Sequence, residues 1–257
     1  MINSNDCFYG NSRLGTNKFS PRDSLQTSKG LGKGLGVKVL IAGANGKVGT
    51  LLCGQMWAAN GFSPVALIRD ARQQTKFTAL GVPSVVGDLE KGLSEFLPGL
   101  DAVVFTAGSG AHTGPDKTID VDQDAAIRLI DDCRQVGVPR FVMISAIGAD
   151  PSSDSPRIRH YLRAKGVADE YLRASGLDYT ILAPGTLTNE GGTGKIAAAE
   201  RLGCRGTLPR EDLSQGIIEV LRNYNSLNKT IQMISGKDPI KKAVAKASGG
   251  DALPPIL

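Results

Sequence analysis

The sequence has few of the residues that build metal centres or disulfide frameworks. Only two histidines, His112 and His160, occur in 257 residues, and the four cysteines form no C-x-x-C pair. The cysteines are Cys7, Cys53, Cys133 and Cys204. This sparse usage is typical of a reducing compartment, and it argues against both disulfide bonds and a structural zinc ion. We therefore expect a functional site without a metal.

Long apolar runs, aromatic side chains and a basic surface are missing as well. No stretch approaches the roughly 18 apolar residues that a membrane span requires, so no span is expected. Aromatic residues make up only 5% of the chain. The formal net charge is +5, but +3 of it lies in residues 1–36, which carry five basic and two acidic side chains. Because the rest is nearly neutral, nucleic-acid binding is not expected.

Residues 1–36 differ in composition from everything that follows. They are rich in Ser, Thr, Asn and Gly, end in "KGLGKGLG", and show neither helical nor strand periodicity. We favour a disordered N-terminal extension on a cytoplasmic protein. The alternative is an organellar transit peptide for a plastid or mitochondrion, because the segment is basic, rich in hydroxyl groups and fairly poor in acidic residues.

From residue 37 to about residue 250, short apolar runs alternate with segments of helical period. The apolar runs predict buried strands at 37–43, 63–69, 83–87, 101–108, 140–146 and 178–185. The segments with a helical period are 47–59, 71–80, 91–97, 116–136 and 157–175. Continuously apolar strands separated by helices indicate a parallel sheet covered on both faces. The sequence therefore predicts an α/β protein with a doubly wound parallel sheet, the Rossmann fold.

The end of this domain, from about residue 186 to 247, has a different pattern. A Gly-rich stretch "NEGGTGK" is followed by a helix over 211–222, a strand near 229–235 and a last short helix. We interpret these elements as a small C-terminal cap region that packs against the same domain.

A glycine-rich turn joins the first predicted strand to the first predicted helix. The stretch "GANGKVG" places Gly43, Gly46 and Gly49 at the spacing G-x-x-G-x-x-G. In a dinucleotide fold the first glycine permits the turn, the second lets the backbone approach a pyrophosphate, and the third allows close helix–strand packing. The pyrophosphate rests on N–H groups at the helix N-terminus. The expected cofactor-binding residues of this turn are Gly43, Asn45, Gly46, Lys47, Val48 and Gly49.

The end of the second predicted strand indicates which cofactor binds. NAD-specific sites place an acidic residue about 20 residues after the glycines, where it binds the ribose 2′-OH. Here that position is Arg69, whose guanidinium suits a 2′-phosphate, and Lys47 adds positive charge nearby. The sequence thus favours NADP(H), with the neighbouring Asp70 left open as a rival ligand for a 2′-OH.

Three polar side chains near the fifth strand form the expected chemical site. Tyr161 and Lys165 are four residues apart on a predicted helix, so they share a face. A lysine ammonium stabilises a phenolate, which predicts a lowered tyrosine pKa and general acid/base catalysis by Tyr161. Lys165 is also expected to bind the nicotinamide ribose. Ser145 ends the fifth strand, where its hydroxyl could orient a substrate or simply cap a turn.

These motifs together resemble the short-chain dehydrogenase/reductase superfamily. More narrowly, the chain is similar to its atypical, extended-like NAD(P)-binding members, which are named NAD(P)-dependent epimerases or dehydratases. The resemblance covers nearly all of residues 37–247 and includes "GANGKVG", "VVGDL", "VGVPRFVMIS", "YLRAKGVADEYLRASGLDYTILAPG", "TNEGGTGKI" and "PREDLSQGIIEVL".

The resemblance implies further residue roles. Asp88 and Leu89 would contact the adenine, and Ala107 and Gly108 would line the nicotinamide ribose. Closure over the nicotinamide would involve Pro184, Gly185 and Thr186. Asp120 would take the place of the superfamily's active-site asparagine, although an aspartate there also favours the start of a helix.

Two functions are compatible with these observations. The first is an NADP(H)-dependent oxidoreductase or epimerase acting on a small carbonyl or hydroxyl compound, with Tyr161 and Lys165 intact. The second is a non-catalytic NADP(H)-binding sensor or assembly module. The second is favoured by two departures from the family pattern, Ala183 in place of arginine in "APG" and "SAIG" in place of a double serine. The sequence leaves the substrate and the oligomeric state open.

Overall fold

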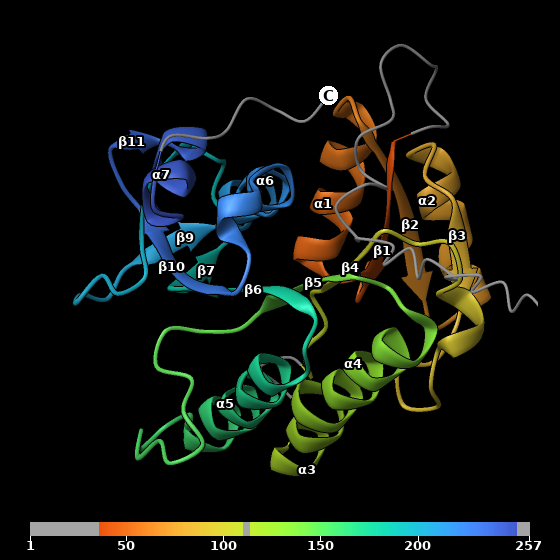
Figure 1. The fold of residues 1–257 in the computed structure, drawn as a ribbon, viewed down its shortest axis with the longest axis horizontal. Helices are drawn as coiled ribbons and strands as arrows, with labels where there is room; N and C mark the ends of the chain where they lie inside the picture. Colours follow the sequence, from red (N-terminus) through yellow and green to blue (C-terminus); the bar gives the residue numbers. More distant parts are fainter. Residues whose placement is uncertain (1–35, 110–113, 251–257) are drawn as a thin grey trace, which may run out of the picture.

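The computed structural model describes residues 36–109 and 114–250, and its centre is a nine-stranded sheet (Figure 1). The strand order is β11-β8-β10-β6-β5-β4-β1-β2-β3. The strands are β1 (Val37–Ala42), β2 (Phe62–Ile68), β3 (Ser84–Val86), β4 (Ala102–Phe105), β5 (Arg140–Ile144), β6 (Asp178–Pro184), β8 (Lys195–Ala199), β10 (Lys229–Ser235) and β11 (Asp238–Pro239).

Seven neighbouring strands of this sheet, from β3 to β10, are parallel. Only β8 and β11, at the far edge, pair antiparallel. All six strands expected between residues 37 and 185 are present, in the order 3-2-1-4-5-6. The prediction of a doubly wound α/β fold is therefore confirmed.

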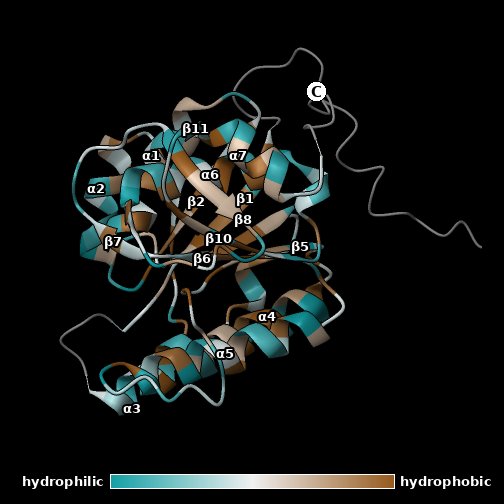
Figure 2. Ribbon diagram, turned by 90° about the vertical axis from the view of Figure 1, so that its left-hand side faces the viewer, coloured by the Kyte–Doolittle hydropathy of each residue, from teal (hydrophilic) through white to brown (hydrophobic). Residues whose placement is uncertain are grey.

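Helices cover both faces of the sheet, as Figures 1 and 2 show. One face carries α1 (Lys47–Ala58), α2 (Gln74–Ala79), α6 (Arg210–Arg222) and α7 (Ile240–Ala247). The other carries α3 (Pro115–Thr118), the π-helix η3 (Ile119–Asp124), α4 (Ala125–Val136) and α5 (Arg159–Ala174). Short 3₁₀ helices complete the chain as η1 (Ala71–Gln73), η2 (Ser94–Phe96) and η4 (Tyr224–Ser226).

Strand β1 shows why its sequence is apolar throughout. Val39 and Ile41 belong to the core cluster under α1 and α6, whereas Leu40 and Ala42 belong to the cluster under α4 and α5. Successive side chains of a strand point to opposite faces, so a strand covered on both sides has no solvent-facing position to fill. The same burial on both faces holds the glycine turn that follows β1 against a rigid sheet.

The C-terminal segment contributes more to the sheet than expected. The predicted strand at 229–235 is β10, and it extends the main sheet beside β6 because Ile231 and Met233 are fully buried there. Only β7 (Thr186–Thr188) and β9 (Thr207–Pro209) form a separate two-stranded sheet. The expected cap is therefore reduced to these two strands and the loops beside them.

The expectations for residues 1–35, including a transit peptide and the compartment that it would imply, lie outside the described residues. Within the described ranges, none of the helices combines the length and the apolar character needed to cross a membrane.

Candidate functional site

The glycine turn lies between β1 and α1, at the carboxyl-terminal ends of the parallel strands. Gly43 has a φ of +85°, a conformation that side chains rarely adopt, and the N–H of Gly46 donates to its carbonyl at 3.0 Å. A Cβ added to Gly49 would lie 2.4 Å from the Gly43 oxygen and 2.7 Å from the Ala44 Cα. Backbone contacts therefore leave no room for a side chain at Gly43 or Gly49.

The N-terminus of α1 is open to an anion. Its N-cap is Gly46, which offers no side-chain hydrogen bond, and its first turn contains no acidic residue. Val48 and Gly49 are buried, while Asn45, Gly46 and Lys47 are exposed. The first N–H groups of a helix need acceptors, and an uncapped glycine-rich start is the arrangement that binds phosphates. The turn therefore fits a dinucleotide pyrophosphate.

The neighbouring end of β2 is positively charged. Arg69 follows β2 and is exposed, whereas Asp70 is bound by the backbone N–H and the guanidinium of Arg72. Arg72 holds the pKa of Asp70 below its usual value. From α2, the Lys76 ammonium donates to the Asn45 Oδ1 at 3.1 Å, which brings a second cation to the turn. The carboxylate that could have bound a 2′-OH is thus engaged elsewhere.

Two further pairs of residues that are expected to contact the cofactor lie in the loops after β3 and β4. Asp88 and Leu89 come after β3, and Oδ1 of Asp88 accepts from the Glu90 N–H at 3.1 Å. Ala107 and Gly108 come after β4. A Cβ on Gly43 would lie 2.5 Å from the Ala107 nitrogen, so the glycine turn is in contact with the loop after β4.

The end of β6 supplies the last expected cofactor residues. Pro184 is buried at the end of the strand, and Gly185 leads into β7, which begins with the exposed Thr186. A Cβ on Gly185 would lie 2.3 Å from the Gly206 oxygen, so only glycine fits there. Apart from Lys165 on α5, the expected cofactor residues therefore lie at or just after the carboxyl-terminal ends of parallel strands.

Lys165 is at the centre of a cluster of buried polar side chains, next to the end of β5 and the loop after β4. Its side chain is 3% exposed, and its ammonium lies 3.1 Å from Oδ1 of Asp122. It also donates to the carbonyl of Ile144 at 3.1 Å and that of Ala107 at 3.5 Å. Burial opposes the charge of Lys165, but Asp122, with smaller contributions from Tyr161 and Asp169, raises its pKa. The lysine is therefore held charged, and it ties α5 to β5 and to the loop after β4.

Tyr161 lies one turn before Lys165 on α5, with its ring centroid 6.0 Å from the ammonium. The expected lowering of its pKa is not found. Burial raises the pKa of Tyr161, Lys165 opposes this increase, and Asp122 and Asp169 add to it. Because the lysine charge is balanced by Asp122, it cannot outweigh desolvation of the phenolate. Tyr161 therefore keeps its proton at neutral pH.

Ser145 lies at the end of β5 and is paired with a carboxylate. Its hydroxyl donates to Oδ2 of Asp169 at 2.5 Å, and both residues are buried. The other carboxylate oxygen, Oδ1, has no hydrogen-bond partner within the described part of the chain. Burial raises the pKa of Asp169 to about 6, against the hydrogen bond from Ser145 and the charge of Lys165. Ser145 is thus held in place through α5.

The structure does not bring Asp120 into this group. Its side chain is 52% exposed and lies 3.8 Å from Lys117, as an i,i+3 surface pair. Asp122, two residues later, is fully buried, and its Oδ2 accepts from the N–H of Ser109 at 2.9 Å. Both residues lie on the π-helix η3, whose wider turn changes which residues face inward. A regular helical period over 116–136 could not reveal this difference.

Sequence reasoning missed Asp122, Asp169 and Lys76. Asp169 carried a usable signal, because it follows Lys165 by four residues and therefore shares the face of Tyr161 and Lys165. Lys76 carried none, since its position beside Asn45 depends on how α2 packs.

Comparisons with known proteins show to which family the chain belongs. Residues 43–224 match the model of a family described as NAD(P)H-binding. The "Uncharacterized sugar epimerase YhfK" of Bacillus subtilis is 38% identical over 214 residues, which are 82% of this chain and 100% of the relative. A more distant relative, the photosystem II assembly factor Ycf39 of Cyanophora paradoxa, is 27% identical over 147 residues, 56% of this chain and 44% of its own.

Solved structures show the same similarity. A Bacillus halodurans protein, provisionally named an NAD-dependent epimerase/dehydratase, is 40% identical with a TM-score of 0.77, covering 82% of this chain and 100% of that one. The oxidoreductase ylbE of Lactococcus lactis is 27% identical with a TM-score of 0.72, covering 84% and 99%.

Proposed function

The chain belongs to the NAD(P)H-binding family of Rossmann-fold oxidoreductases and epimerases, and on this premise we propose that it is an NADP(H)-dependent reductase of a small carbonyl compound. One observation carries the proposal. An open, uncapped glycine turn lies at the carboxyl-terminal ends of the parallel strands, and so do the buried Ser145 and Lys165 with the half-buried Tyr161 beside them. When bound, the nicotinamide would supply a hydride, and the chain would place the acceptor and provide a proton.

The preference for NADP(H) rests on charge. Arg69 follows β2, the strand beside β1, the Lys76 ammonium contacts Asn45 of the glycine turn, and the carboxylate of Asp70 is bound by Arg72. A guanidinium binds a phosphate with two charge-assisted hydrogen bonds but gains little from a neutral 2′-OH. Because Asp70 is already paired, Arg69 and Lys76 favour the cofactor that carries a 2′-phosphate.

Arg69→Ser is expected to weaken NADPH binding by about 10- to 100-fold, the range for loss of hydrogen bonds to a charged group. NADH affinity should change little, because the adenosine ribose of NADH has no 2′-phosphate for Arg69 to bind. Binding can be followed by nicotinamide fluorescence. Arg134→Ser is the control, since Arg134 is an exposed residue of the last turn of α4. A wild-type protein that binds NADH as tightly as NADPH would contradict the assignment.

The protonated Tyr161 suits the reducing direction. A phenol with a raised pKa retains its proton and can donate it to a carbonyl oxygen as negative charge develops there. Ser145, held by Asp169, would orient the same oxygen. Lys165 would hold α5 against β5 and the loop after β4, because its hydrogen bonds go to the carbonyls of Ile144 and Ala107 and its ion pair is with Asp122.

Tyr161→Phe is expected to lower NADPH-dependent reduction of a responsive carbonyl compound about 100-fold, the lower range for loss of a general acid. NADPH affinity should stay within about twofold. Tyr171→Phe is the matched control, because Tyr171 lies on the same helix and bonds to Asp131 outside the site. Equal turnover by wild type and Tyr161→Phe would remove Tyr161 from the chemistry.

A second candidate function is a cofactor-binding sensor or assembly module. It is favoured by Lys165, whose ammonium already donates to two carbonyls and pairs with Asp122, and therefore has little freedom to bind a ligand. The name of the relative Ycf39, an assembly factor, points in the same direction. Tight NADPH binding without turnover across a broad carbonyl panel would select this function.

A further inference from the structure

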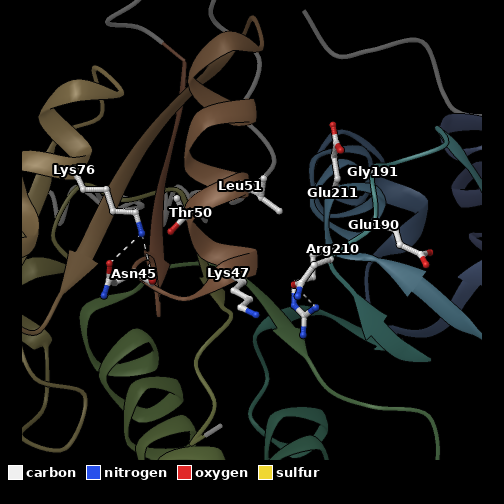
Figure 3. A pocket seen from close by; sticks show the side chains of 10 residues that line it. Asn45, Lys47, Thr50, Leu51, Lys76, Glu190, Gly191, Arg210 and Glu211 are labelled. Carbon is white, nitrogen blue, oxygen red and sulfur yellow. Dashed lines mark hydrogen bonds between the residues drawn. The ribbon is translucent and has the colours of Figure 1, made fainter. Parts of the chain in front are cut away.

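A cleft of about 430 Å³ opens beside the glycine turn. It separates the start of α1 from the start of α6 and the loop 189–191 (Figure 3). The residues that line it, most of which have a polar or charged side chain, are Asn45, Lys47, Thr50, Leu51, Lys76, Asn189, Glu190, Gly191, Arg210 and Glu211. Two of these side chains, Lys47 and Arg210, lie on either side of the gap and are directed toward the same end of it (Figure 3).

Arg210 is held in position by its own segment. Its Nη1 donates to the carbonyl of Leu187 at 3.2 Å and to Oδ1 of Asn189 at 2.8 Å. Within the described residues, neither Nε nor Nη2 has a hydrogen-bond acceptor, and no carboxylate lies within ion-pair distance. A fixed guanidinium with a free edge loses little conformational entropy when it binds an anion.

Lys47 supplies a second positive charge, and among the described residues no carboxylate forms an ion pair with it. Glu211 lines the same cleft, but its Oε2 accepts from the N–H of Gly192 at 2.8 Å and so serves the loop. In Figure 3 the carboxylates of Glu190 and Glu211 are directed away from the gap between Lys47 and Arg210. The gap is therefore positively charged.

We propose that Lys47 and Arg210 bind the anionic group of the substrate, a phosphate or a carboxylate. The inference rests on the proposed function, because it takes the glycine turn as the cofactor seat. In the proposed function the N–H groups of α1 bind the pyrophosphate and Arg69 binds a 2′-phosphate, while Lys76, which also lines the cleft, already donates to Asn45. Arg210 instead follows β9, whose Pro209 pairs with Thr188 of β7, directly beyond the nicotinamide residues Pro184–Thr186. A carbonyl compound reaching the nicotinamide from this side would meet Arg210.

The test uses inorganic phosphate and acetate as probes on protein saturated with NADP⁺, with binding measured by calorimetry. Wild type is expected to bind one anion in addition to the cofactor, and Arg210→Met is expected to bind it at least about tenfold more weakly. Arg222→Met is the matched control, because Arg222 lies at the opposite end of α6 and pairs with Glu219. Preference for phosphate indicates a phosphorylated substrate, and preference for acetate indicates a carboxylate.

Two results would overturn the proposal. One is that neither probe binds to the cofactor-saturated protein. The other is that phosphate only displaces the cofactor and that Arg210→Met weakens NADPH binding, which would make Arg210 part of the pyrophosphate seat. Both differ from a failure of the proposed function, in which wild-type protein would not bind NADPH at all.

Discussion

Lys165→Met is expected to lower the free energy of unfolding by about 3–5 kcal/mol, the cost of leaving a buried charge without its partner. Asp122 is fully buried, and the Lys165 ammonium 3.1 Å away is its counter-ion. Without the lysine, the carboxylate must stay charged in a poorly solvated site or take up a proton. Chemical denaturation of wild type and variant in urea measures the difference.

The double variant Asp122→Asn with Lys165→Met makes this prediction specific to the ion pair. It removes both charges, so it should be more stable than Lys165→Met alone, with a coupling energy of about 2 kcal/mol. If the two single losses simply add, the pair is not coupled. A loss below about 1 kcal/mol for Lys165→Met would show that Asp122 is solvated.

The sheet could be predicted because burial on both faces leaves a strong signal in the sequence. Strands such as β4 are apolar at every position and are bounded by turns, so their existence and order follow from the pattern. Strand β8 could not be predicted in this way. Its sequence "KIAAA" has little β-branched character, and it forms a strand because β10 offers it a pairing edge.

The two halves of the site differ in the same respect. The phosphate turn depends on local backbone geometry, which glycine spacing reports directly, and the structure places Gly43 and Gly49 at contacts that only glycine allows. The polar group around Lys165 depends on how η3, α5 and β5 pack. Sequence alone therefore placed Tyr161 and Lys165 on one face, but not the aspartate beside them or the upward pKa shift of Tyr161.

Gly49→Ala is expected to weaken NADPH binding by about 100-fold and to lower stability by about 1–3 kcal/mol. The new methyl group would lie 2.4 Å from the carbonyl oxygen of Gly43 and 2.7 Å from the Ala44 Cα, which are backbone atoms of the turn itself. Because backbone cannot rotate away as a flexible side chain can, the turn must move. The N–H groups that we propose bind the pyrophosphate would move with it.

Gly54→Ala is the matched control for this variant, since it makes the same change five residues later on the same helix. Its methyl group would meet only a Leu80 methyl carbon at 3.9 Å, an ordinary contact. Replacing a helix-interior glycine with alanine should raise stability by about 0.5–1 kcal/mol and leave NADPH affinity unchanged. If Gly49→Ala lowers stability and Gly54→Ala raises it, the loss comes from the geometry of the glycine turn and not from the stability of α1 as a helix. Equal NADPH affinity in both variants would instead mean that the close packing at Gly49 does not shape the cofactor seat.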